Sequence, residues 1–130
     1  MDTIQLDIVS PERAVFSAPA TLVEVPGTEG DFGVMPGHMP LISTLRPGVV
    51  TVHAEASFMR FFLTAGYAEV TNESCTILSE HVRDMNAVDK AAAEEELAHA
   101  KRVLDHATSE TERQRAEAQV ALAQALVDAI

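Results

Sequence analysis

Five histidines and one cysteine are the side chains in this sequence best suited to binding a metal ion or acting in catalysis. They are His38, His53, His81, His99, His106 and Cys75. No histidines form an HxH or HExxH pattern, and His99 and His106, seven positions apart on one predicted helix face, have no evident third ligand. Cys75 lies in a predicted strand, where a small buried side chain is expected rather than a nucleophile. These residues predict no metal site and no catalytic residue.

A glycine-rich segment, residues 27–33, is the nearest approach to a phosphate-binding loop. It reads Gly-Thr-Glu-Gly-Asp-Phe-Gly and lacks the Gly-Lys-Ser/Thr ending of such loops. Its two carboxylates, Glu29 and Asp31, would repel phosphate. The sequence also has no GxSxG nucleophile elbow. We therefore interpret the segment as a tight hairpin loop, and we expect no cofactor and no reaction catalysed by this chain alone.

The acidic composition excludes further function classes. The 130 residues include 20 Asp and Glu against 9 Lys and Arg, a formal net charge of -11, with no Trp and one Tyr. Nucleic-acid binding needs clustered basic side chains and aromatic platforms, and docking to anionic lipid also needs basic residues. No apolar run approaches the eighteen or so residues of a membrane span. We expect a soluble chain that binds neither nucleic acid nor lipid directly.

The chain changes character between residues 83 and 88, which predicts two domains. All six glycines and all six prolines precede this point, and alanine dominates after it. Glycine and proline separate short strands, whereas alanine is the best helix former. We predict an N-terminal antiparallel β-sandwich over residues 1–84 and a C-terminal antiparallel two-helix hairpin over residues 88–130.

Alternation of apolar and polar residues marks the strands of the first domain. Strands are predicted over residues 4–8, 21–25, 49–54, 58–63, 66–71 and 76–79, with turn residues between them. The segment Phe58–Leu63 is largely apolar on both faces. Either it is a central strand that its own domain covers on both sides, or one face meets a partner protein.

Helical spacing marks the second domain. Residues Ala93, Leu97, Ala100, Leu104 and Ala107 form one apolar stripe. Asp89 is the predicted N-cap of the first helix, and Ser109 with Glu112 forms a capping box that begins a second helix ending near residue 128. Residues 120–127 are apolar nearly all round, so this surface needs the β domain or another chain. Since alanine contacts bury little area, we hypothesise that the hairpin docks weakly enough to move.

Two segments identify a family. Residues 29–41 read Glu-Gly-Asp-Phe-Gly-Val-Met-Pro-Gly-His-Met-Pro-Leu, and residues 45–49 read Leu-Arg-Pro-Gly-Val. They closely resemble the pattern EGxxGxxPGHxPL, then a short strand, then (L/I)xPG, of the epsilon subunit of the F-type ATP synthase, which is called delta in mitochondria. Residues 6–11, Leu-Asp-Ile-Val-Ser-Pro, also look like the family start. The resemblance covers the whole chain, because the family combines a β-sandwich with a two-helix hairpin.

The resemblance implies a non-catalytic rotor subunit. Family members bind the gamma subunit at the foot of the central stalk and rest on the polar loops of the c-ring, which commonly carry arginine. They transmit torque toward the alpha and beta subunits, and reach the membrane only through the complex, at the cytoplasmic face of the bacterial inner membrane. By position, Glu29, Gly30 and Asp31 match the loop that meets the c-ring. His38 and Met39 match a segment near gamma and the ring, and Ser10 matches a gamma-facing position.

The resemblance also frames two questions about the hairpin. Some relatives bind ATP through (I/L)-D-x-x-R-A, which here reads Val-Asp-Lys-Ala-Ala-Ala over residues 88–93, with Ala92 in place of arginine. We therefore expect no physiological ATP binding. In other relatives a long basic second helix extends toward alpha and beta and inhibits hydrolysis. Here that helix has only Arg113 and Arg115, so weak or no inhibition is expected. The alternatives are a nucleotide-sensing regulator and a freestanding β-sandwich interaction module.

Overall fold

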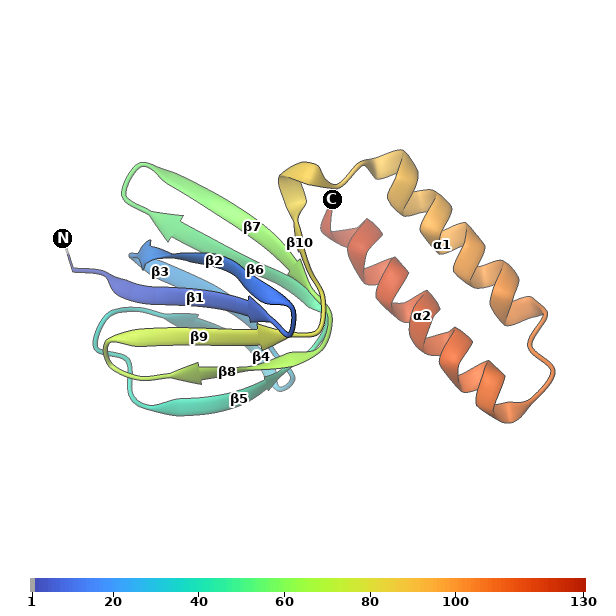
Figure 1. Cartoon of the computed structure of the whole chain (residues 1–130), viewed down its shortest axis with the longest axis horizontal. Helices are drawn as coiled ribbons and strands as arrows, with labels where there is room; N and C mark the ends of the chain where they lie inside the picture. The colour runs from blue at the N-terminus through green and yellow to red at the C-terminus, as the bar shows by residue number, and fades with distance from the viewer. Residues whose placement is uncertain (1) are drawn as a thin grey trace. The chain divides into compact units, whose positions relative to one another are not determined.

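The computed structural model describes residues 2–130, which form two compact units, one ending at Asn86 and one running from Ala87 to Ile130. The first unit contains ten β-strands and the second two α-helices (Figure 1). The predicted fold class, a β-sandwich followed by a helical hairpin, is confirmed.

The strands of the first unit form one continuous ladder that folds into two layers. In chain order they are β1 (Ile4–Ser10), β2 (Arg13–Ala20), β3 (Leu22–Gly27), β4 (Gly30–Val34), β5 (Leu41–Leu45), β6 (Gly48–Ala54), β7 (Ser57–Leu63), β8 (Gly66–Val70), β9 (Ser74–Ser79) and β10 (Val82–Asp84). Their spatial order is β10-β7-β6-β3-β5-β8-β9-β1-β2, with β4 paired to β3. One residue pair, Gly27 with Leu45, joins β3 to β5, and the strands on either side of it face each other (Figure 1).

Alternating side chains from both layers fill the core. Ile4, Leu6 and Ile8 of β1 are fully buried, as are Val23 of β3 and Ile77 of β9. This is the period-2 pattern expected of strands with one solvated face. On β7, Phe61 and Leu63 point into the core and Phe61 packs on Phe16 with ring centroids 5.2 Å apart.

The structure differs from the predicted strands at its edges. Strands β2, β4, β5 and β10 were not identified from alternation. β2 and β10 end the ladder and β4 pairs only with β3, so each has fewer buried positions to create a pattern. β2 also contains Pro19, which an edge strand tolerates. One pair, β1 with β9, is parallel in an otherwise antiparallel arrangement.

The second unit is an antiparallel hairpin of α1 (Lys90–Asp105) and α2 (Glu110–Ala129), preceded by a 3-10 turn over Met85–Ala87 (Figure 1). Both predicted caps are confirmed. The Asp89 carboxylate accepts a hydrogen bond from the Ala92 amide at 2.9 Å, and the Ser109 hydroxyl accepts one from the Glu112 amide at 3.1 Å. Neither helix has the length and hydropathy that crossing a membrane requires.

Candidate partner-contact surface

The tip of the β3–β4 hairpin carries three of the predicted contact residues, Glu29, Gly30 and Asp31. Gly27 and Gly30 pair across the strands, so Thr28 and Glu29 form a two-residue turn at the apex. Gly30 has a φ of +133°, which residues with side chains rarely adopt. A Cβ on Gly27 would lie 2.6 Å from the Gly30 carbonyl oxygen. Both glycines are therefore required by the turn, which leaves Glu29 exposed at its apex.

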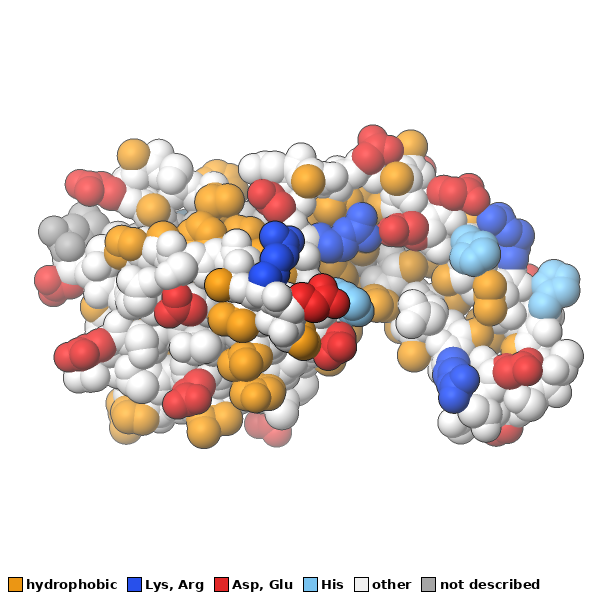
Figure 2. Space-filling view, in the orientation of Figure 1, with side chains coloured by type: hydrophobic (Ala, Val, Ile, Leu, Met, Phe, Trp, Pro, Cys, Tyr) orange, Lys and Arg blue, Asp and Glu red, His pale blue; other side chains and the backbone are white. Residues whose placement is uncertain are grey.

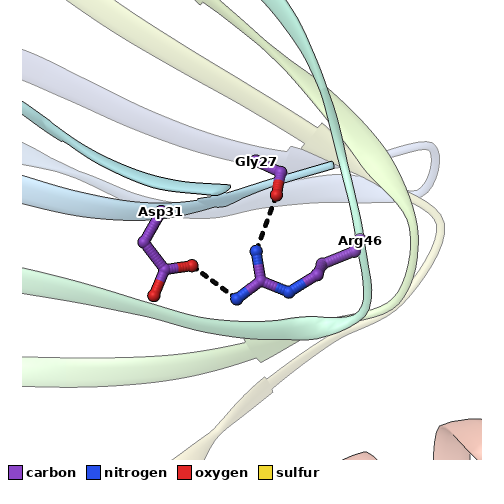
Figure 3. Close-up of polar contacts among 3 residues, drawn as sticks. All are labelled: Gly27, Asp31 and Arg46. Carbon is purple, nitrogen blue, oxygen red and sulfur yellow. Dashed lines mark hydrogen bonds and ion pairs between the residues drawn. The ribbon is translucent and has the colours of Figure 1, made fainter. Parts of the chain in front are cut away.

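Arg46, which sequence reasoning did not single out, fastens this tip to the end of β5. Its Nη1 donates a hydrogen bond to the carbonyl oxygen of Gly27 at 2.6 Å, and its Nη2 forms an ion pair with Oδ1 of Asp31 (Figure 3). The Asp31 side chain is 71% exposed, so the ion pair alone contributes about 0–1 kcal/mol. The hydrogen bond to Gly27, a buried residue, is of the charge-assisted kind, which typically contributes about 1.5–3 kcal/mol.

Backbone contacts hold the same tip in place. The Thr28 amide donates to the Thr44 carbonyl oxygen at 3.1 Å, and the Arg46 amide donates to the Pro26 carbonyl oxygen at 3.0 Å. The hydroxyl groups of Thr28 and Thr44 also share a hydrogen bond of 2.7 Å. The tip is thus attached to β5 by backbone and side chain together. We refer to residues 27–31, held in this way, as the clasped loop.

The two carboxylates of the clasped loop differ in their electrostatic compensation. Asp31 is paired with Arg46, whereas Glu29 is exposed and has no hydrogen bond or ion pair with any residue of the described chain. Over the visible face of the β unit, acidic side chains are scattered rather than gathered in one patch (Figure 2). The uncompensated negative charge of the loop is therefore located at Glu29.

His38 and Met39 lie in a second turn, between β4 and β5. Gly37 has a φ of +83°, and its amide donates to the Asn72 carbonyl oxygen at 2.9 Å, which ties this turn to the one between β8 and β9. The His38 amide donates to the Met35 carbonyl oxygen at 3.1 Å, and the His38 Nδ1 lies 2.6 Å from the Met39 carbonyl oxygen. The turn is ordered by its own contacts, while the Met39 side chain is 79% exposed.

Apolar side chains are exposed along the same stretch of chain. They are Met35 (58%), Met39 (79%), Leu41 (37%) and Ile42 (74%), and we call this stretch the 35–42 apolar surface. For Phe58–Leu63 the sequence left open a strand covered on both faces or one face that meets a partner. Phe61 and Leu63 of one face belong to the core, and on the other face Phe62 is buried while Phe58 is 63% exposed. Exposed apolar side chains are typical of partner contacts where they share one face, and Leu41 and Ile42, consecutive on β5, point to opposite faces of that strand.

Ser10 lies in another part of the sheet. It ends β1, which pairs with β2 and β9, and its hydroxyl donates to the Arg13 carbonyl oxygen at 3.3 Å. With Pro11, Gly66 and Tyr67 it lines a hollow of about 420 Å³. The structure thus brings Glu29, Gly30 and Asp31 together on one loop. Ser10 lies apart from them, at the end of β1.

The cysteine and histidines that the sequence offered for catalysis or metal binding either have a structural role or lie apart from one another. Cys75 is buried, and burial raises the pKa of its thiol to about 11. Within residues 2–130, no three His, Cys, Asp or Glu side chains are placed to hold a metal ion together. His53 lies 2.6 Å from the Glu24 carboxylate, between Nε2 and Oε2, and bridges the neighbouring strands β6 and β3.

Four of the five Lys and Arg residues of the hairpin, together with His99 and His106, lie in the half where its helices join, whereas Lys90 begins α1 (Figure 2). His99, His106 and Arg115 line an open groove of about 550 Å³, and both histidines are exposed. The neighbouring Arg102 donates to Oε1 of Glu95 at 2.9 Å. At the other end of α1, the Asp89 carboxylate is committed to the helix cap.

Comparisons with known proteins agree on one family. Residues 3–84 match the family described as "ATP synthase, Delta/Epsilon chain, beta-sandwich domain". A protein of Rhodospirillum rubrum named ATP synthase epsilon chain is 43% identical over 129 residues, covering 98% of this chain and 96% of its own length. The protein of the same name from Rhodobacter capsulatus is 45% identical over 106 residues, covering 82% and 80%.

Solved structures share the fold at low sequence identity. A chain of the Euglena gracilis mitochondrial ATP synthase, in a structure of OSCP, F1 and c-ring, superposes with a TM-score of 0.85 at 20% identity, covering 98% of this chain and 81% of its own. A chain of the Tetrahymena thermophila mitochondrial ATP synthase central stalk and c-ring gives a TM-score of 0.70 at 12% identity, covering 98% and 96%.

Proposed function

The chain belongs to the delta/epsilon-chain family of ATP synthase, and on this premise we propose that it is a non-catalytic subunit of the rotor. It couples rotation of the c-ring, through the gamma subunit, to ATP synthesis by the complex. It acts at the cytoplasmic face of the bacterial inner membrane, as a peripheral part of F1, and contributes no chemical step of its own.

The clasped loop carries this proposal. A subunit that transmits torque needs contact surfaces that do not deform under load. The clasped loop meets this need because two arginine contacts and backbone hydrogen bonds hold it to β5. Glu29, Gly30 and Asp31 face the c-ring polar loops. Exposed ion pairs are worth only about 0–1 kcal/mol each, so they set the register of the contact rather than its strength.

The apolar contacts supply the strength. The 35–42 apolar surface begins at the opposite end of β4 from the clasped loop, and with His38 and Met39 it meets gamma and the ring. Burying apolar area contributes about 25 cal/mol per Å². Burial of large exposed side chains such as Met39 and Ile42 therefore contributes more binding free energy than the exposed ion pairs of the clasped loop. Ser10 lies on a separate part of the gamma contact.

The hairpin has a minor regulatory role in this proposal. An extended hairpin would bring its helices to the alpha and beta subunits, but the basic residues of α2 are confined to its start, at Arg113 and Arg115. ATP is not expected to control the hairpin, because Asp89 serves as a helix cap and Ala92 provides no cation for phosphate.

The test is association followed by restoration of function. Immobilised gamma subunit and purified c-rings of the same organism are each incubated with the full-length chain, and membrane vesicles stripped of the chain are then reconstituted with it. We expect binding to gamma and recovery of proton-driven ATP synthesis. A chain that neither binds gamma nor restores synthesis would refute the proposal.

A further inference from the structure

We infer that Arg46 is a positioning residue for the clasped loop, and that Glu29 rather than Asp31 supplies the charge that a cationic partner surface meets. This inference rests on the proposed function, because it assigns roles within the surface that would contact the c-ring. It divides the two carboxylates of one loop into an internal role and an external role.

The internal role belongs to Asp31. Its carboxylate already holds a cation, the Arg46 guanidinium, which comes from the same chain and is fixed at its other nitrogen by the Gly27 carbonyl oxygen. A partner's arginine could bind Asp31 only by sharing it with Arg46 or by displacing it. Displacement exchanges one exposed ion pair for another and releases an uncompensated cation beside the incoming one. The Asp31–Arg46 pair has no net charge and therefore attracts a charged partner only weakly.

The external role follows from the position of Glu29. It is one of the two apex residues of the turn, its side chain is exposed, and no described residue forms an ion pair or hydrogen bond with it. The glycine pair that defines the turn keeps this residue at the apex, since a side chain at Gly27 or Gly30 would disturb the backbone there. Glu29 thus carries the whole net charge of the loop at its most projecting point.

Arg46 makes this arrangement rigid. One guanidinium group joins β4, through Asp31, to the end of β3, through Gly27, and does so from a residue that follows β5. A lysine at position 46 would keep the charge but has no planar fork to reach both acceptors together. The arginine therefore positions the loop, and the loop in turn positions Glu29.

The experiment measures binding of the full-length chain, in complex with its gamma subunit, to purified c-rings over a series of NaCl concentrations. Four variants are compared with the unchanged chain: Glu29→Gln, the double variant Asp31→Asn with Arg46→Gln, the single variant Arg46→Lys, and the control Glu55→Gln. Glu55 is exposed in the turn between β6 and β7 and has no ion pair with a described residue, so this control changes net charge as Glu29→Gln does. The double variant removes the pair without changing net charge.

We expect Glu29→Gln to weaken binding about two- to fivefold at low salt, as the loss of an exposed ion pair does, and to flatten the salt dependence. Glu55→Gln should match the unchanged chain. The double variant should keep the original salt dependence while losing affinity, because the loop is less well positioned. Arg46→Lys should lose less affinity than the double variant but more than none, because lysine cannot reach both acceptors together, again without altering the salt dependence.

In the salt series, two results overturn the inference. The first is a salt dependence that Glu29→Gln leaves unchanged. The second is a salt dependence that the double variant flattens as much as Glu29→Gln does. If the unchanged chain binds gamma but its complex does not bind c-rings at all, this inference and the ring contact of the proposed function both fail. If the unchanged complex binds and Glu29→Gln binds equally well, only the inference fails.

Discussion

The Glu112 carboxylate accepts hydrogen bonds from both the amide and the hydroxyl of Thr108, each at 2.9 Å, so the predicted capping box reaches one residue further back than its usual form. These bonds, the amide first, lower the pKa of Glu112 from its ordinary value of 4.5. Because the charged form is favoured in the folded state, its stabilisation is fully present above pH 4.5. It is lost as the pH falls through the lowered pKa.

The first prediction concerns this acid sensitivity of the hairpin. Glu112→Gln should make the helical signal of the full-length chain, followed by circular dichroism at 222 nm, less dependent on pH below about 4.5. Glu117→Gln, which changes an exposed carboxylate on the same helix, is the control and should behave like the unchanged chain. Identical pH profiles for the two variants would contradict the role assigned to Glu112.

Cys75 should be unreactive in the folded chain. Its pKa of about 11 exceeds the ordinary value of 9.0 because burial disfavours the thiolate. A thiol reagent at pH 8 should therefore label the native chain slowly and the chain in denaturant rapidly. The raised pKa also predicts that the stability of the β unit falls as pH rises from 9 toward 11, where the unfolded thiol ionises and the folded one does not. Rapid native labelling would show that the thiol is accessible.

Gly66 should not tolerate a side chain. A Cβ at this position would lie 2.0 Å from the Leu78 carbonyl oxygen, so the β8–β9 ladder must move to accept it. Gly66→Ala should lower the free energy of unfolding by about 1–3 kcal/mol, measured by urea denaturation. Gly33→Ala is the matched control, because its Cβ would meet only the flexible end of Leu22 at 3.2 Å. Equal losses in the two variants would refute the steric explanation.

Nucleotide binding should respond to one substitution. Calorimetry should detect no ATP binding to the full-length chain at micromolar concentration, whereas Ala92→Arg should raise its affinity about 10- to 100-fold through a charge-assisted hydrogen bond. Ala91→Arg, on the neighbouring exposed position of α1, controls for the added charge. Micromolar binding by the unchanged chain would show that the hairpin senses nucleotide.

Removing the hairpin should leave catalysis by the complex nearly unchanged. A chain ending at Ala87 retains all ten strands, and the clasped loop lies wholly within them. Reconstituted complexes should therefore hydrolyse ATP at close to the original rate. A several-fold rise on truncation would show that the hairpin inhibits the enzyme and that the few basic residues of α2 suffice for it.

The sequence predicted the elements whose side chains are buried in a regular order. Ile4, Leu6 and Ile8 alternate because β1 is covered on one face, and Asp89 and Ser109 are caps because their side chains bond to amides close by in the chain. The physical determinants of these elements lie within a few residues. They can therefore be read from a short window of sequence.

The remaining features depend on residues far apart in the chain. The edge strands β2, β4 and β10 owe their conformation to a neighbouring strand, and their own residues carry little pattern. Arg46 is separated by 15 positions from Asp31, and nothing local distinguishes it from a solvated arginine. The loop was therefore predicted, but the contact that rigidifies it was not.

The parallel pairing of β1 with β9 sets the order in which the β unit can be completed during synthesis. Leu6 of β1 lies opposite Cys75 of β9. The first strand to leave the ribosome, β1, therefore completes its hydrogen bonding only after β9, one of the last strands, has been synthesised. Until then β1 has only β2 to pair with, and the backbone groups along its other edge stay without strand partners. Such long-range pairing slows folding, so the nascent chain should acquire its protease resistance only after β9 has emerged.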